Sequence, residues 1–133
     1  MYYNWETACE VCPDGWHLPS EAEYQELIAF LGGRMVAGAK LKEYGTYHWN
    51  PTASGESSGA TNSSGFTALP NGYYNQNLNT FTSVGESCDL QTSTEVEHLN
   101  ELVYNLHLYN SLHYADMNLN SKEIGVLVRC VKD

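Results

Sequence analysis

The stretch CPDGWHLPSEAEYQEL, residues 12–27, carries the clearest helix start in this chain. Ser20 and Glu23 form an S-x-x-E capping box, in which each side chain accepts a hydrogen bond from an otherwise unpaired backbone N–H. Large side chains then recur at helical spacing, namely Tyr24, Leu27, Ile28 and Leu31. Gly32 and Gly33 follow, and glycine adopts the left-handed conformation that commonly ends a helix. The sequence therefore predicts a helix that begins at Ser20 and ends before Gly32.

The segments that follow this helix are less regular. A second helix is predicted over residues 35–43, with three side chains partly buried: Met35, Ala39 and Leu41. Residues 45–65 are rich in Gly, Ser, Thr and Asn, which predicts a long surface loop. This loop contains a G-x-S-x-G match at 55–59. A nucleophile elbow needs a buried strand before it and a helix after it, so we interpret the match as a coincidence.

Short strands are predicted elsewhere, with a linker at residues 6–19. They cover residues 2–5, 66–69, 81–85, 98–109, 111–117 and 124–131. Residues 98–109 also fit a helix, but the alternation of Leu102, Tyr104, Leu106 and Leu108 favours a strand. The segment at 111–117 is its expected hairpin partner, and the apolar run at 124–131 is an expected central strand. Early helices followed by short strands predict one α+β domain over residues 1–133.

The charge and composition of the chain exclude some classes of protein. The formal net charge is −10, and the six Lys and Arg residues form no stripe, which argues against binding nucleic acid or an anionic membrane. No apolar run is long enough to span a bilayer, so no membrane insertion is expected. A charged fraction of 17%, with abundant Tyr, Asn, Ser, Thr and Gly, is typical of a loop-rich extracellular domain. Met1 leads into the chain without a signal peptide, which favours an excised domain.

Four cysteines are present, at positions 9, 12, 88 and 130, and four cysteines allow three pairings. Cys9 and Cys12 form a C-x-x-C motif. A redox pair normally lies at a helix N-terminus, but the predicted helix begins only at Ser20. Structural zinc would need a second close pair, and Cys88 and Cys130 are far apart in sequence. Structural disulfides are therefore the favoured interpretation.

Four segments together resemble a known family: YNW at 3–5, CPDGWHLPSEAEYQEL at 12–27, GFTALPNGYYN at 65–75 and VRCVKD at 128–133. They are similar to the Fibrobacter succinogenes major paralogous domain, which is common in surface and secreted proteins of Bacteroidetes. The resemblance implies a C-type-lectin-like fold, in which two helices flank small antiparallel sheets and the terminal strands pair. It also implies an extracellular or cell-surface location.

The resemblance further implies how the chain ends are held. Residues 2–5 would lie beside residues 124–131. If Cys12 then pairs with Cys130, the start of the first helix is tied to the last strand, and Cys9 with Cys88 remains as the second pair. The sugar-binding relatives of this fold bind calcium through E-P-N, Q-P-D and W-N-D triplets. None of these triplets occurs here, so calcium-dependent sugar binding is not expected.

Residues 104–121 are rich in Tyr, Asn, His and Ser. Such side chains give large contact areas and adaptable hydrogen bonds, as in antibody paratopes. The segment also resembles the variable regions written by diversity-generating retroelements, although the family can be rich in these residues here without diversification. His107, His113 and Asp116 could bind a metal from adjacent strands, but polar strand and loop residues are the favoured interpretation.

We therefore expect a non-enzymatic ligand-binding or display module that recognises a glycan or a protein surface without metal or cofactor. The expected binding residues are Tyr104, His107, Tyr109, Asn110, His113, Tyr114, Asp116, Asn118 and Asn120, joined by Tyr47 and Trp49 from the long loop. Two alternatives stay open. One is an oxidase-type enzyme that uses Cys88 or Cys130, and the other is a structural spacer in a surface protein.

Overall fold

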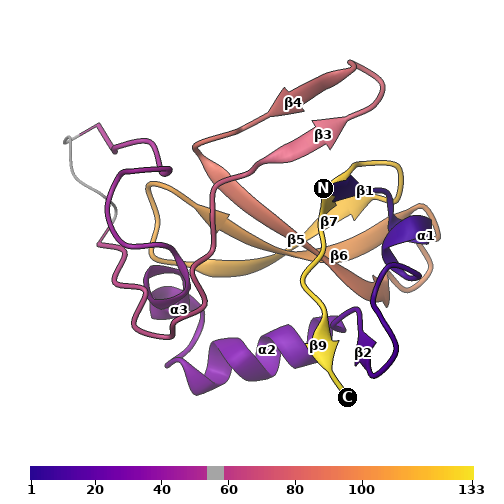
Figure 1. Cartoon of the computed structure of the whole chain (residues 1–133), viewed down its shortest axis with the longest axis horizontal. Coiled ribbons are helices and arrows are strands. Elements are labelled where there is room, and N and C mark those ends of the chain that lie inside the picture. The colour runs from indigo at the N-terminus through magenta and orange to yellow at the C-terminus, as the bar shows by residue number, and fades with distance from the viewer. Residues whose placement is uncertain (54–58) are drawn as a thin grey trace.

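A five-stranded sheet forms the centre of the molecule (Figure 1). The computed structural model describes residues 1–53 and 59–133. The strand order is β1-β8-β5-β6-β7. The strands are β1 (Tyr2–Tyr3), β5 (Ser87–Glu95), β6 (Leu102–Tyr109), β7 (Ala115–Ser121) and β8 (Val126–Leu127). The pairs β5–β6 and β6–β7 are antiparallel, and β8 meets β5 in parallel.

Three helices lie within the described residues. They are α1 (Trp5–Ala8), α2 (Glu21–Phe30) and α3 (Arg34–Leu41). The predicted capping box of α2 is confirmed: the hydroxyl of Ser20 accepts from the Glu23 N–H at 3.2 Å, and the Glu23 carboxylate accepts from the Ser20 N–H at 2.8 Å. The expected second helix is α3, which is shifted toward the N-terminus by a residue or two. Met35 was expected to be partly buried but is 54% exposed.

The apolar core lies between the helices and one face of the sheet. Tyr24 and Ile28 on α2, with Leu31 at its C-terminal end, belong to this core. They pack there with side chains from α3 and from the sheet. The sheet contributes Cys88, Leu90, Leu106, Leu108 and Ala115. The spacing that predicted α2 is thus the spacing of its buried face, because residues three and four apart lie on the same side of a helix.

Some of the predicted strands are confirmed and others are wrong. The choice of strand for residues 98–109 is confirmed by β6, and its hairpin partner is β7, which begins later than predicted. The expected strand at 66–69 is wrong, since these residues contribute only an isolated bridge between Lys42 and Ala68. The predicted strand at 81–85 is confirmed in part by β4 (Thr80–Thr82), which forms a small hairpin with β3 (Tyr73–Asn75). The longest strand, β5, was not predicted.

The two ends of the chain are fastened to each other twice. The expected pairing of terminal strands is confirmed by β1 and β8, although the predicted strand at 2–5 stops at Tyr3 because α1 begins at Trp5. Residues 6–19, expected to be a linker, contain α1 and β2 (Trp16–His17), and β2 pairs with β9 (Val131–Lys132). The expected continuous central strand at 124–131 is therefore divided between two sheets.

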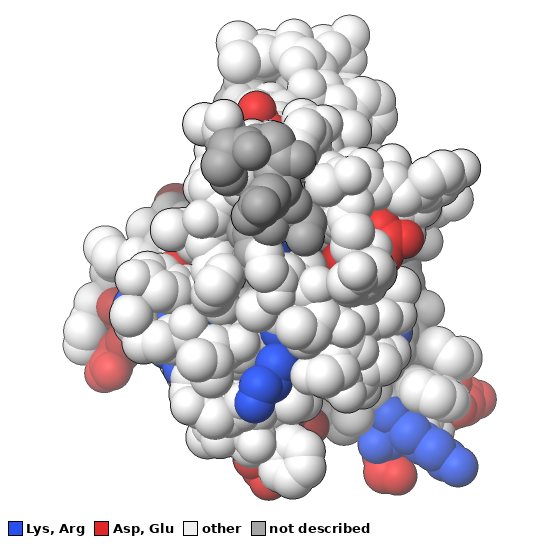
Figure 2. Space-filling model, turned by 90° about the vertical axis from the view of Figure 1, so that its left-hand side faces the viewer, with Lys and Arg blue, Asp and Glu red and all other residues white. Residues whose placement is uncertain are grey.

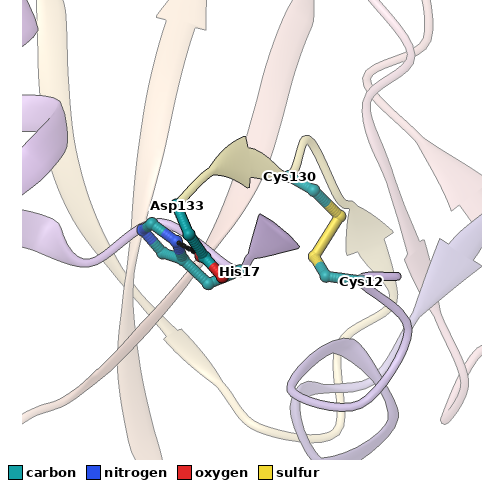
Figure 3. The surroundings of a disulfide bond; sticks show 4 residues. All are labelled: Cys12, His17, Cys130 and Asp133. Atoms are coloured by element: carbon teal, nitrogen blue, oxygen red, sulfur yellow. Dashed lines mark hydrogen bonds and ion pairs between the residues drawn. A yellow bond between two sulfur atoms is a disulfide. The ribbon is translucent and has the colours of Figure 1, made fainter. Parts of the chain in front are cut away.

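A disulfide reinforces this second fastening (Figure 3). It joins Cys12 and Cys130, which are 118 residues apart in sequence, at a Cα–Cα distance of 5.7 Å. The ring of His17 binds Asp133 through Nδ1 and Glu23 through Nε2, each at 2.7 Å. These ion pairs raise the pKa of His17, with the hydrogen bond to Asp133 as the largest cause. The expected second pair is not formed, because Cys9 is an exposed free thiol and Cys88 a buried one.

Within the part of the chain that the structure describes, no helix is long and apolar enough to cross a membrane. The long loop predicted at 45–65 contains no helix or strand where it is described. Most of the G-x-S-x-G match lies outside the described residues.

Candidate functional site

The side of the sheet that faces away from α2 and α3 is polar. Side chains alternate along a strand and cross-strand partners share a face, so the register defines its members. We call this surface the polar face. Its members are Ser87, Asp89 and Gln91 on β5, Asn105, His107 and Tyr109 on β6, and Asp116, Asn118 and Asn120 on β7.

A buried carboxylate organises the polar face. Asp89 has only 4% of its side chain exposed. It accepts hydrogen bonds from Ser87 Oγ at 2.8 Å, Asn105 Nδ2 at 2.7 Å and His107 Nδ1 at 2.9 Å. A buried charge is tolerated only when it is paired and hydrogen-bonded, and here three donors come from two strands. The network therefore fixes the positions of the side chains around it.

His107 extends this network toward solvent. Because Asp89 binds its Nδ1, the Nε2 atom is left for a ligand or water. Burial alone lowers the pKa of His107, but the hydrogen bond and charge of Asp89, together with the charge of Asp116, outweigh it and raise the pKa above its ordinary value. The imidazole stacks on the ring of Tyr109, with centroids 6.0 Å apart. The two rings form a small aromatic platform at the surface.

The β7 side of the polar face is held by α3. Arg34 forms an ion pair with Asp116, and its guanidinium carbon lies 4.6 Å from the ring centroid of Tyr114. The charge of Asp116 is thereby neutralised in place. Asn118 is exposed and Asn120 half-buried on the same face.

The turn between β6 and β7 is anchored from below by Lys42. This lysine is fully buried, and its Nζ donates to the carbonyls of Tyr109 at 2.8 Å and Leu112 at 2.7 Å. Burial lowers its pKa to about 8. The N–H of Ala39 donates to the carbonyl of His113 at 3.1 Å. These bonds satisfy inward carbonyls of the turn and fix its position against α3.

One glycine makes this close approach possible. A Cβ atom at Gly38 would lie 2.0 Å from the carbonyl oxygen of Tyr114. No larger residue can therefore replace it while α3 packs against the turn. The glycine within α3 thus explains how closely the β6–β7 turn packs against this helix.

The structure brings together many of the predicted binding residues but not all of them. His107, Tyr109, Asp116, Asn118 and Asn120 share the polar face, and the turn carries Asn110, His113 and Tyr114 beside it. Tyr104 lies on the opposite, helix-facing side of β6, because it is an odd number of residues from His107.

The two aromatic residues of the long loop that were expected to bind ligand differ in their exposure. Tyr47 is 87% exposed. Trp49 is only 3% exposed and belongs to the core, where its indole N–H donates to the carbonyl of Ala68 at 3.0 Å. Trp49 is therefore no part of an open binding surface. Its ring lies 5.4 Å from Lys42 Nζ, so it supports the anchor of the turn.

Sequence reasoning missed Asp89, Ser87 and Arg34. Asp89 and Ser87 were missed because β5 was not predicted, and Arg34 because its partners become neighbours only in the folded chain. His107 and Asp116 are cross-strand partners, whereas His113 lies in the turn, 2.9 Å from where a Cβ of Gly59 would be. No group of three or more His, Cys, Asp or Glu side chains that could hold a metal ion occurs in residues 1–53 and 59–133.

The cysteines considered for oxidase chemistry are in unreactive states. Cys130 is oxidised in the disulfide. Burial, and then the charge of Asp89, raise the pKa of Cys88 to about 12. Because the thiolate is the reactive form of cysteine, neither residue supplies a nucleophile at neutral pH.

The end of the molecule formed by α3 and the long loop has a largely uncharged surface. Figure 2 shows uncharged residues over most of this end, with Lys, Arg, Asp and Glu at only a few places. A surface of this kind suits a ligand recognised by hydrogen bonds and ring contacts.

These features define a small mixed α/β domain. Its two ends are joined, and side chains of its polar face are hydrogen-bonded to the buried carboxylate of Asp89. The model of the Fibrobacter succinogenes major domain matches residues 1–132, and the chain belongs to that family. The resemblance inferred from the four sequence segments is thus confirmed. No curated protein and no solved structure matches the chain.

Proposed function

We propose that this domain is an extracellular ligand-binding module that recognises a glycan through the polar face and the β6–β7 turn, without calcium. The observation that carries the proposal is the Asp89 network. It holds His107 and Tyr109 in one arrangement before any ligand arrives. Preorganised side chains lose less entropy on binding, so even a small site can bind well.

The exposed chemistry favours a sugar over a charged partner. Tyr109 and His107 offer ring faces, and Asn118 and Asn110 offer amide donors and acceptors. Ring faces bind the apolar side of a sugar, while amides bind its hydroxyls. Asp116 is already paired with Arg34, which leaves little net charge at the site.

We infer a C-type-lectin-like fold and a cell-surface or secreted location. The paired terminal strands, the two longer helices and the long loop next to the site support the fold assignment. The disulfide supports the location, because disulfides persist in oxidising compartments. A structural spacer in a surface protein is the alternative that the binding experiment excludes.

A glycan array probed with the labelled domain tests the proposal. We expect binding to a restricted set of glycans, loss of binding in Tyr109→Ala, and retention in Phe30→Ala. Phe30 is an exposed aromatic residue on α2, on the opposite side of the sheet from Tyr109, so it serves as the control. Circular dichroism and thermal unfolding verify that both variants fold. Binding that survives Tyr109→Ala, or an array without any bound glycan, contradicts the proposal.

The exposure of each residue also predicts which positions in the segment 104–121 could be genetically diversified. A diversified position must be exposed if new side chains are to reach a ligand. Asn118 meets this requirement, but Asn105 is fully buried beneath the platform. If the domain is a retroelement-variable protein, near-copies of the gene differ at Asn118 and keep Asn105. Near-copies that vary at Asn105 as often as at Asn118 would contradict this assignment.

A further inference from the structure

Two adjoining cavities lie on the helix-facing side of the sheet, away from the polar face. The first has a volume of about 570 Å³ and lies between β1, residues 66–71 and residues 127–129. The second has a volume of about 450 Å³ and lies between α2 and residues 129–131. Both volumes are within the range of small-molecule sites. The cavities share two lining residues, Phe66 and Arg129.

The first cavity has both apolar and polar walls, and one charged side chain lines it. Its walls include Leu69, Leu90, Leu127 and Val128, and Arg129 is the only charged side chain among the described residues that line it. The thiol of Cys88 also lines the cavity, and its raised pKa keeps it neutral. A chamber with apolar wall residues and one cationic side chain at its boundary favours an anion with an apolar body.

Arg129 is held in place with most of its donors unused. Its Nη1 donates to the carbonyl of Phe66 at 2.6 Å, and its guanidinium carbon lies 4.0 Å from the centroid of that ring. A guanidinium has five N–H donors in a planar arrangement that matches a carboxylate. The stacked ring fixes the plane of this group before a ligand binds.

A buried hydroxyl without a partner lies at the same boundary. Tyr24 is only 4% exposed, and its hydroxyl has no hydrogen-bond partner among the described residues. Tyr24 and Arg129 both line the second cavity. Burial raises the pKa of Tyr24 whereas the charge of Arg129 lowers it, so the two groups are within electrostatic range. A buried polar group without a partner is costly, and it is most readily explained when a ligand supplies the partner.

We propose that these cavities bind a small organic carboxylate. Its carboxylate accepts hydrogen bonds from the Arg129 guanidinium and the Tyr24 hydroxyl, and its apolar body occupies the first cavity against Leu90 and Leu127. Two glutamates line the second cavity. Their carboxylates are a poor environment for an apolar group, so the apolar body of the ligand extends into the first cavity. Of these glutamates, Glu23 is already bound to His17 and Ser20, and Glu26 is exposed on α2.

Calorimetric titration of the whole domain with octanoate, and separately with 3-phenylpropanoate, tests this site. Octanamide has the same apolar body as octanoate without the charge, and it is the matched ligand control. We expect octanoate or 3-phenylpropanoate to bind, and octanamide to bind at least about tenfold more weakly, because a charge-assisted hydrogen bond is lost. Absence of heat at millimolar carboxylate, or equal affinity for octanamide, overturns the proposal.

Two variants identify the residues that hold the carboxylate. Arg129→Met keeps an unbranched side chain over Phe66 and is expected to weaken octanoate binding at least about tenfold. Arg34→Met removes an arginine that lines neither cavity and is expected to leave the affinity unchanged.

Tyr24→Phe separates binding from folding. It removes a hydroxyl that the ligand-free protein does not pair, so we expect an unchanged or higher melting temperature together with weaker binding of octanoate. Undiminished affinity in both Arg129→Met and Tyr24→Phe overturns the proposal. Because the site is on the opposite side of the sheet, its failure leaves the glycan proposal unaffected.

Discussion

Removal of the Cys12–Cys130 disulfide should lower the free energy of unfolding by about 5 kcal/mol. The two cysteines are 118 residues apart, so the bond closes nearly the whole chain into a ring. In the chain-entropy model the unfolded state then loses about 2.1 + 1.5R ln n in cal/mol/K, which is about 16 cal/mol/K for this ring, or about 5 kcal/mol at 25 °C. For a chain of this size such a loss corresponds to a decrease in melting temperature of about 15–20 °C.

The folded state should survive the change. The pairing of β2 with β9 and of β1 with β8 holds the ends together without the bond. The effect therefore arises mainly in the unfolded chain, which gains freedom and exposes more surface. We expect the urea dependence of the unfolding free energy to become steeper as well as the midpoint to fall.

The assay is urea unfolding of the Cys12→Ser, Cys130→Ser double variant, followed by tryptophan fluorescence. Cys9→Ser is the matched control, because Cys9 is an exposed free thiol, and its effect should be within about 0.5 kcal/mol. A loss below about 1 kcal/mol in the double variant would refute the reasoning, since changes of that size are common for ordinary substitutions. A comparable loss in Cys9→Ser would refute it too.

Two further predictions concern the charged side chains. Asp133 and Glu23 raise the pKa of His17, so the stabilisation from His17 is complete below its ordinary pKa of 6.5 and is lost as the pH rises through the raised value. The melting temperature should therefore fall across this window in the wild type and change less in His17→Gln; parallel pH profiles would contradict the assignment. Asp89→Ala leaves three donors without their buried acceptor and should cost about 3 kcal/mol or more in urea unfolding. Ser93→Ala, an exposed change on the same strand, should cost little, and equal losses in the two variants would argue against the network.

The parts of the fold that could be predicted were those with a local signal. The capping box at Ser20 marks a helix start within four residues of sequence, and the alternation along 102–108 marks a half-buried strand. The pairing of the chain ends and the Cys12–Cys130 bond came from family resemblance. Short-range patterns are visible in one sequence because they depend on neighbouring residues alone.

The strand β5 could not be predicted for a physical reason. Ser87, Asp89 and Gln91 are buried polar residues, which normally indicate a surface. Asp89 is tolerated inside because Ser87 and, from another strand, Asn105 and His107 donate to it, a condition that exists only in the folded chain. The same holds for Trp49, whose polar sequence context predicts exposure.

The candidate site was predictable as a segment but not as a surface. Tyr and Asn content drew attention to 104–121, and the β6–β7 pairing then sorted these residues onto two faces. Register decided that His107 and Tyr109 point to one side and Tyr104 to the other. One sequence cannot supply a register between strands, because pairing depends on contacts that are distant in the chain.

The central claim is that the polar face is where this domain meets its ligand. The most direct measurement is amide chemical-shift mapping of the ¹⁵N-labelled domain during titration with a glycan selected on the array. The account predicts that the largest shifts occur at His107, Tyr109 and Asn118, with smaller ones in the β6–β7 turn. Shifts confined to α2 and the cavities beside Arg129, with the polar face unchanged at saturation, would contradict it.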